Sequence, residues 1–341
     1  MGLAERGLLP DALIRMGIRR LLKQRLHDEK ASQNATADQR THALREQLSQ
    51  GPIATKTDSA NRQHYEVPAA FYQHALGHRL KYSGCYYPQG VTTLDAAEDA
   101  ALSLVCKRAS LSDHIDILEL GCGWGSLTLW MAEHYPASRI TAVSNSASQR
   151  DYILGQAAVC ALNNIEVITA DINDFETGRR FDRVVSIEMF EHMANHAELM
   201  RRVANWLRTD GKLFVHVFTH QHYTYRFEEE GQSNWMGRHF FTGGMMPAHD
   251  YLPGFDQHLH CTSDWWLNGK HYQQTAEHWL QNTDANREAI LAIFAKTYGQ
   301  ANSRRWLQRW RIFFMACAEL WGYQAGEQWG VSHYVFEKAE R

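Results

Sequence analysis

Two carboxylates and one imidazole stand close together in the segment from Ile187 to Met193. Glu188, Glu191 and His192 are spaced i, i+3 and i+4, so a helix over this segment would direct all three side chains the same way. Such a cluster can attract a cation and accept a proton from it. The alternative is a helix start whose acids complement the helix dipole, with one hydrogen-bonded histidine. The segment directly follows an aliphatic strand signal, and this position beside a sheet edge favours acid–base chemistry.

A glycine-rich turn precedes this cluster in the sequence. The strand signal that ends at Leu120 runs into Gly121-Cys122-Gly123-Trp124-Gly125, and a helix signal follows. Glycines at such a turn let the backbone and the helix N-terminal amides approach a nucleotide-type cofactor. A nicotinamide dehydrogenase would normally carry an acid about twenty positions further on. Here that place is Ser144-Asn145-Ser146, and the glycine spacing is Gly-x-Gly-x-Gly, so we favour S-adenosylmethionine as the cofactor.

Further candidate cofactor residues follow the next strand signals. Asn145 and Gln149 can replace the missing carboxylate by hydrogen bonding. Asp171 and Ile172, at the end of the third strand, supply a carboxylate and an apolar surface that suit the adenine amino group and ring face. The structural alternative for this pair is a helix N-cap followed by a core residue. Ile187, at the end of the fourth strand, completes the predicted cofactor-binding set.

The middle of the chain alternates strand and helix signals. Strands are predicted at 115–120, 139–144, 165–169, 183–187 and 211–219, and helices at about 126–134, 147–162 and from 187 to about 208. Such βαβ units require right-handed crossovers, hence a parallel sheet whose ligand site lies outside the carboxyl ends of its strands. The sequence therefore predicts an α/β fold, a Rossmann-like, mostly parallel sheet with helices on both faces.

Helical and aromatic segments flank this core. A basic amphipathic helix is expected over 10–29, and packing against the body or a second subunit is a commoner fate for it than membrane binding. The polar stretch 30–58 predicts a mobile linker or an exposed helix. After Phe218 we expect an aromatic insertion to about Gly269, acting as a lid, then helices near 275–281, 285–298 and 306–320 and a last strand at 331–336. The predicted regions are 1–95 (N-terminal helices), 96–220 (cofactor-binding core), 221–324 (lid and substrate-binding helices) and 325–341 (last strand).

Composition limits the classes of partner. The formal net charge is −3 with both signs interspersed, which gives no electrostatic footprint for nucleic acid, so we expect a small-molecule substrate. The six cysteines form no Cys-x-x-Cys pair, and the chain has no signal-peptide pattern and no run apolar enough to cross a bilayer, which favours a reduced cytoplasm. His258 and His260 could bind a metal, but without an accompanying carboxylate pattern a surface or pocket-lining role is expected instead. We predict no metal site.

Several segments, in one order, resemble a known family. They are Asn61–Pro68, Lys81–Tyr87, Leu120–Gly125, Glu188–Met193 and Phe313–Tyr323. Together they resemble the cyclopropane fatty acid synthase superfamily of methyltransferases, and within it the coclaurine N-methyltransferase branch. The resemblance extends from Pro10 to Lys338. It implies the class I S-adenosylmethionine methyltransferase fold, with N-terminal helices and a helical, aromatic lid.

The resemblance also assigns roles to residues. It places Tyr82 and Ser83 at the methionine end of the cofactor, Gly121 and Gly123 at its backbone, Asn145 and Gln149 at its ribose, and Asp171 and Ile172 at its adenine. It matches Glu66, Glu188, Glu191 and His192 to the positions that hold and deprotonate an amine. We expect substrate contacts from Tyr65, Trp265, Phe314 and Trp329, as part of an aromatic pocket that also includes Trp266.

The lipid-cyclopropanating relatives differ at the positions that hold their bicarbonate base. They usually have Gly in place of Glu188, Cys in place of Gly84, and a Tyr in the helix where this chain has Ile312 and Phe313; the Cys and the Tyr help to hold the bicarbonate. His216 matches a base-holding position in those relatives, with a hydrogen-bonded strand-end residue as the alternative. We therefore expect methyl transfer to the nitrogen of a small apolar or aromatic amine. The alternatives are C-methylation or cyclopropanation of an alkene or unsaturated acyl chain, and a cofactor-binding protein with an inactive site, against which the intact acid cluster argues.

Overall fold

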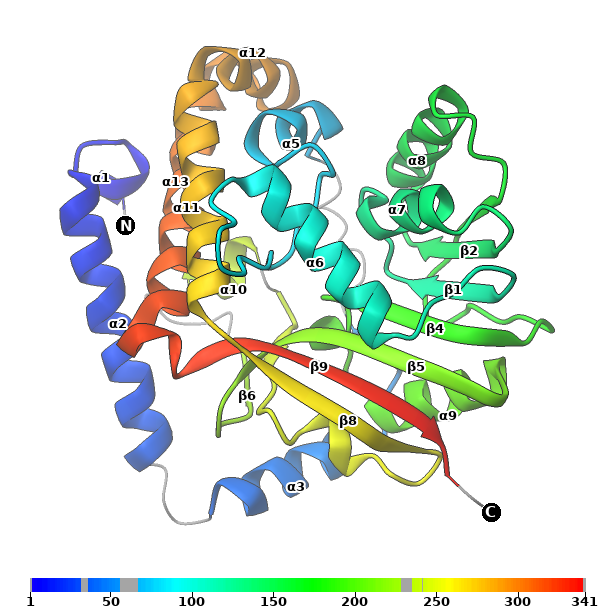
Figure 1. Ribbon diagram of the computed structural model, residues 1–341. Coiled ribbons are helices and arrows are strands. Elements are labelled where there is room, and N and C mark those ends of the chain that lie inside the picture. Colours follow the sequence, from blue (N-terminus) through cyan, green and yellow to red (C-terminus); the bar gives the residue numbers. More distant parts are fainter. Residues whose placement is uncertain (1, 32–35, 56–66, 228–234, 241, 340–341) are drawn as a thin grey trace. The chain divides into compact units, whose positions relative to one another are not determined.

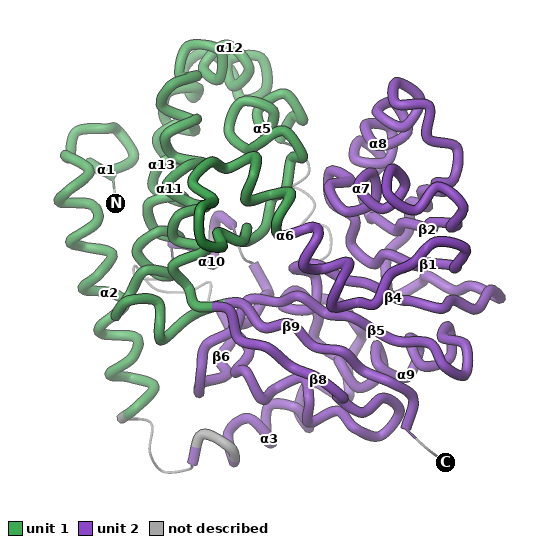
Figure 2. Tube along the Cα trace, in the orientation of Figure 1, with its two compact units in different colours: residues 1–34, 66–100, 268–330 green, residues 35–65, 101–267, 331–341 purple. Residues whose placement is uncertain are grey.

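The computed structural model describes residues 2–31, 36–55, 67–227, 235–240 and 242–339 (Figure 1). The chain forms two compact units, each built from three stretches of sequence (Figure 2). Unit 1 comprises residues 1–34, 66–100 and 268–330, and unit 2 comprises residues 35–65, 101–267 and 331–341. Within the described residues, no helix is both long enough and apolar enough to cross a membrane.

A seven-stranded sheet forms the centre of unit 2. Its strands, in order across the sheet, are β3 (Ile165–Thr169), β2 (Arg139–Ser144), β1 (Asp116–Leu120), β4 (Phe181–Ile187), β5 (Leu207–His220), β9 (Trp329–Lys338) and β8 (Leu259–Asn268). The five strands from β3 to β5 pair in parallel. The predicted parallel α/β core is confirmed, since β1 to β5 and β9 all lie where the apolar runs place them.

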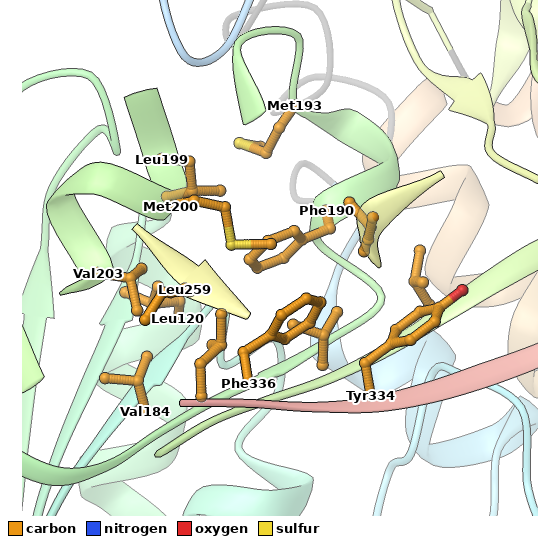
Figure 3. Close-up of a cluster of buried hydrophobic side chains, with 14 of the residues drawn as sticks. Leu120, Val184, Phe190, Met193, Leu199, Met200, Val203, Leu259, Tyr334 and Phe336 are labelled. Atoms are coloured by element: carbon orange, nitrogen blue, oxygen red, sulfur yellow. The ribbon is translucent and has the colours of Figure 1, made fainter. Parts of the chain in front are cut away.

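Helices cover both faces of this sheet because the strand side chains alternate between two apolar layers. Leu118 and Val184 point into a cluster shared with α9 (His196–Trp206) and α3 (Ala37–Leu48), part of which Figure 3 shows. Ile117 and Val185 point into a second cluster beneath α6 (Leu94–Arg108) and α7 (Ser126–His134). The remaining elements of unit 2 are α8 (Ala147–Val159), η1 (Phe190–His192), β6 (Tyr225–Arg226), α10 (Trp235–His239), β7 (Met245–Met246) and η2 (Leu252–Gly254).

Unit 1 is helical. Its elements are α1 (Gly2–Glu5), α2 (Asp11–Ala31), α5 (Ala69–Ala75), the first turns of α6, α11 (Lys270–Ala285), α12 (Arg287–Tyr298), α13 (Gln300–Gly322) and η3 (Tyr323–Gly326). The predicted amphipathic helix at the start of the chain is confirmed as α2. Arg15 of this helix bonds Glu277 of α11 at 2.6 Å and Glu319 of α13 at 3.0 Å, so α2 is attached to the long helices of the same unit.

Three segments differ from the prediction or sharpen it. The continuous helix expected from 187 to about 208 is wrong. Glu188 has φ +46°, Phe190–His192 form a short 3₁₀ turn, and α9 begins only after Asn195, whose side chain accepts from the Glu198 N–H. A left-handed residue cannot continue an α-helix, so the three polar side chains come from a turn.

The second difference concerns the end of the aromatic insertion. Residues 259–268, expected within the lid, form β8 at the edge of the main sheet. Their alternating pattern was hidden by tryptophans and histidine, which suit a half-buried strand as well as a pocket. The stretch 30–58 contains the helix α3, one of the two alternatives that its polar composition left open.

Candidate active site

The candidate cofactor residues of unit 2 lie at one edge of the sheet. Gly121 follows β1, Asn145 follows β2, Asp171 follows β3 and Glu188 follows β4. These strands are neighbours in the order β3-β2-β1-β4, and all their pairs are parallel. Four segments that are distant in sequence therefore meet at the carboxyl edge, where α/β sheets bind their ligands.

The glycine turn has the geometry of a close-approach site. Gly121 has φ +77°, and a Cβ added to it would lie 2.8 Å from Cγ of Met189, so only glycine fits between β1 and the segment after β4. Gly123 has φ +51°, and a Cβ built there meets no described heavy atom within 4 Å. The backbone at Gly123 is thus open to a ligand, which fits a cofactor bound against this turn.

Asn145 and Gln149 occupy the start of α8. Gln149 is buried, and its amide oxygen accepts a hydrogen bond from the Ser144 hydroxyl at 2.7 Å. Ser146 caps the helix by accepting from the Gln149 N–H at 3.4 Å. Asn145 is half-buried at the end of β2. The turn that would carry the ribose contacts is therefore held by its own hydrogen bonds, and the ribose role itself stays a prediction.

Asp171 and Ile172 lie in a turn rather than at a helix N-cap. Asp171 Oδ1 accepts from the Asn173 N–H at 2.8 Å. The Asn173 side chain bonds both the N–H and the carbonyl of Ala54, at 3.0 Å and 3.1 Å, so residues from the start of unit 2 support this turn. Ile172 packs against the larger core cluster. The adenine role of the pair remains a prediction.

Glu188 and Glu191 form the acidic part of the site. Glu188 donates its backbone N–H to the His216 carbonyl at 2.8 Å, and its Oε1 lies 3.2 Å from His216 Nε2. Glu191 is only 1% exposed, and among the described residues neither of its carboxylate oxygens has a hydrogen-bond partner. Burial, together with the nearby Glu188 charge, raises the pKa of Glu191 well above its usual range. An ionised Glu191 beside Glu188 is therefore unfavourable unless a proton or a cation compensates its charge.

The turn that carries Glu191 and His192 is anchored on both sides. The Phe190 ring points into the core cluster below the turn (Figure 3). His196, at the start of α9, lies with Nε2 2.8 Å from the Phe190 carbonyl oxygen. Burial lowers the pKa of His196 to about 4, so it is neutral and donates to that carbonyl. His192 follows Glu191 and is half-buried.

Unit 1 contains the other predicted cofactor residues. The buried Lys81 donates from Nζ to the Ser83 hydroxyl and to the Gly84 carbonyl, both at 2.6 Å. Tyr82 packs beside Trp279, with ring centroids 5.7 Å apart. A positive charge thus stands next to Ser83, the residue predicted to contact the charged methionine end of the cofactor.

Two predicted contacts, one to cofactor and one to substrate, share an aromatic cluster in unit 1. The Phe314 ring centroid lies 5.6 Å from those of Trp279 and Trp310, and the Tyr82 ring packs against the same two tryptophans. Trp279 and Trp310 were not singled out from the sequence, although Trp310 and Phe314 are four residues apart and must share a helix face. Trp329, also in unit 1, is fully buried with Tyr323 5.7 Å away.

The other predicted substrate residues are placed differently. Trp265 belongs to unit 2, where it packs with Ile187 against the cluster beneath α6 and α7 and lies under the Arg108 guanidinium at 4.6 Å. Trp266 points to the opposite face of β8, beside His249. Tyr65 and Glu66 lie outside the described residues. The expected aromatic pocket stays a prediction.

Comparisons with known proteins show the family of this chain. The family described as mycolic acid cyclopropane synthetase matches residues 54–327. The (S)-coclaurine N-methyltransferase of Thalictrum flavum subsp. glaucum is 37% identical over 98% of this chain and 94% of its own length. The enzyme of the same name from Papaver somniferum is 35% identical, covering 98% and 96%.

Solved structures give the same assignment. Coclaurine N-methyltransferase bound to N-methylheliamine and SAH superposes with a TM-score of 0.94 at 36% identity, covering 99% of this chain and 98% of that one. A mycolic acid cyclopropane synthase complexed with SAH and CTAB shares the fold, with a TM-score of 0.69 at 20% identity and coverage of 84% and 99%. The chain therefore belongs to the mycolic acid cyclopropane synthetase family and is an S-adenosylmethionine-dependent methyltransferase of its coclaurine N-methyltransferase branch.

Proposed function

We propose that the protein methylates the nitrogen of a small amine with an aromatic framework, using Glu188, Glu191 and His192. The observation that carries this proposal is the buried carboxyl group of Glu191, which lies close enough to Glu188 to feel its charge. Glu191 is excluded from water, and its oxygens have no hydrogen-bond partner among the described residues. An ammonium group supplies both the charge and the donors that such a pair requires.

The chemistry needs two actions from these residues. An alkylamine is largely protonated at neutral pH, and an ammonium nitrogen has no lone pair with which to attack. Glu188, held by His216, attracts the cation. Glu191, whose pKa burial raises, accepts the proton together with His192.

When bound, S-adenosylmethionine supplies an electrophilic methyl group on a sulfonium. The deprotonated nitrogen would take this methyl group, S-adenosylhomocysteine would leave, and the amine proton would stay on the carboxyl and imidazole cluster. Within unit 2, the Gly121–Gly125 turn is the segment that would hold the cofactor.

The position of Gly84 argues against bicarbonate-assisted lipid chemistry. A Cβ added to Gly84 would lie 2.9 Å from Cδ1 of Tyr272, so the Cys expected in lipid-cyclopropanating relatives does not fit without movement of that ring. His216, which matches a base-holding position in those relatives, bonds Glu188 instead. Both observations support an amine acceptor over an alkene.

The test is a screen with labelled cofactor. Matched pairs that differ only at the reacting atom, such as benzylmethylamine and benzyl methyl ether, would be incubated with the full chain beside unsaturated phospholipids. We expect label in the amines only. Transfer to the lipids with none to any amine would overturn the proposal.

A further inference from the structure

A chain of hydrogen bonds within unit 2 ends at Glu188. Oε1 of Glu188 lies 3.2 Å from His216 Nε2, His216 Nδ1 lies 2.9 Å from His333 Nε2, and His333 Nδ1 lies 2.8 Å from the Arg108 guanidinium. Both histidines are buried, at 2% and 1% exposure. The four residues come from α6, β5, β9 and the segment after β4, so no local sequence pattern connects them.

The chemistry of the end groups sets the direction of every bond in this chain. Arginine only donates, so His333 Nδ1 must accept from Arg108 and the His333 proton must be on Nε2. That proton is donated to His216 Nδ1, which places the His216 proton on Nε2, facing Glu188. The last group, a carboxylate, only accepts. Hydrogen bonding therefore assigns both imidazoles as neutral Nε2–H tautomers.

We propose that Arg108 and His333 are positioning residues that hold His216 as a hydrogen-bond donor to Glu188. The inference rests on the proposed role of Glu188 in amine binding. These hydrogen bonds direct the His216 Nε2–H at the Glu188 carboxylate, with the charged Arg108 guanidinium at the far end of the series. The Glu188 backbone has a left-handed φ of +46°. The series holds the Glu188 carboxylate in one orientation for contact with the ammonium, with an N–H donor facing one of its oxygens.

The same chain does not conduct protons away from the site. A relay needs an acceptor at its far end, and the far end here is a guanidinium that cannot take a proton. Arg108 is kept in place by the Trp265 ring, which lies 4.6 Å from its guanidinium carbon. Trp265 therefore helps to fix the position of the Arg108 guanidinium.

A purely structural role for the chain is the competing explanation, and matched variants separate the two. His333→Gln keeps an acceptor for Arg108 and a donor for His216, whereas His333→Phe keeps the ring shape but removes both. Arg108→Met removes the donors but keeps an unbranched side chain. Lys212→Met is the control. Lys212 of β5 forms a 2.7 Å ion pair with Glu337 of β9, so it joins the strands that carry His216 and His333 but takes no part in their hydrogen bonds.

The first readout is the tautomer itself, from nitrogen NMR of histidine-labelled full-length protein, with His216→Gln and His333→Gln used for assignment. We expect His216 and His333 of the wild type to be neutral with the proton on Nε2. In Arg108→Met and His333→Phe, His216 should show mixed tautomers or an imidazolium. Another tautomer in the wild type, or an unchanged His216 signal in both variants, would overturn the inference.

The second readout is kinetic, with the best amine from the screen. His333→Phe and Arg108→Met should lower kcat/KM for the amine about five- to a hundredfold, leave the KM for S-adenosylmethionine within about twofold, and leave the melting temperature near that of Lys212→Met. His333→Gln should recover most of the loss. Equal losses in His333→Gln and His333→Phe would mean that the ring is needed only for packing. If Glu188→Gln is fully active, the proposed function of Glu188 has failed; if Glu188→Gln is impaired while the Arg108 and His333 variants are normal, only the positioning inference has failed.

Discussion

Glu188 and His216 are joined twice, once through the backbone and once through their side chains. The Glu188 N–H donates to the His216 carbonyl at 2.8 Å, and His216 Nε2 lies 3.2 Å from Glu188 Oε1. The backbone bond continues the pairing of β4 with β5 by one residue beyond Ile187. Glu188 is therefore held at the strand end even though its φ is left-handed, and its carboxylate has a defined direction.

Glu188→Gln should impair amine methylation. The substitution preserves the shape and an acceptor for His216 but removes the negative charge, which costs about 1–3 kcal/mol of interaction with an ammonium, roughly ten- to a hundredfold in kcat/KM. Steady-state kinetics with a saturating cofactor measures this effect. Glu166→Gln, an exposed acid on β3, should be silent. Equal kinetics in both variants would remove Glu188 from the mechanism.

His192→Ala should lower kcat itself, by about a hundredfold if the imidazole shares in proton removal. Raising the pH should partly restore the rate, since a larger fraction of the amine then carries its own lone pair. The measurement is a pH–rate profile of variant and wild type with one amine. A constant ratio of the two rates across the pH range would exclude His192 from proton transfer.

Gly123→Val should abolish cofactor binding while the fold persists. A branched side chain there both conflicts with φ +51° and fills the open space in front of the turn. Calorimetry with S-adenosylmethionine, beside circular dichroism, tests this expectation. Gly178→Val is the control, because Gly178 is exposed, has no left-handed φ, and an added Cβ there meets no heavy atom of the described residues within 4 Å. Undiminished affinity in Gly123→Val would contradict the site.

Glu119→Gln should stabilise the protein at alkaline pH. Glu119 lies inside β1, accepts from the Thr128 hydroxyl at 2.5 Å, and burial raises its pKa from 4.5 to about 8. The folded state thus holds this proton more tightly than the unfolded chain does, so its contribution to stability falls as pH rises from about 4.5 to about 8.

The measurement for Glu119→Gln is the difference in unfolding free energy between variant and wild type as a function of pH. Glutamine retains the acceptor for Thr128 and carries no titrating proton. The unfolding free energy of the variant relative to that of the wild type should rise steadily from about pH 4.5 to about pH 8 and stay constant at higher pH. A difference that does not depend on pH would mean that Glu119 titrates normally.

The parallel core was predictable because its signals are local. Aliphatic runs such as Ile165–Thr169 and the glycine turn after Leu120 determine strands and their end by side-chain pattern and backbone freedom. The acid cluster was found for the same reason. The local conformation of this cluster could not be predicted from the sequence, because the left-handed φ of Glu188 depends on bonds to His216 in another strand.

Long-range partners were beyond such signals. His333 and Arg108 are 225 residues apart in sequence and meet because α6 packs on the face of the sheet to which β9 contributes. His333 alternates in a strand pattern like any buried polar residue, and Arg108 ends a helix, where basic residues are common. The contact between Trp265 and Arg108 could not be predicted either, because residues 259–268 were not expected to form the strand β8.

The proposed acceptor atom of the methyl group is an amine nitrogen. The most direct measurement incubates the protein with methyl-labelled S-adenosylmethionine and an equimolar mixture of an aromatic secondary amine and an unsaturated phospholipid, with and without bicarbonate. Carbon NMR and mass spectrometry of the products then locate the label. We predict label only in an N-methyl group, at a rate that bicarbonate does not change. Label in a cyclopropane or methyl branch of the lipid, stimulated by bicarbonate and with the amine untouched, would show that the acceptor is the lipid alkene and not an amine.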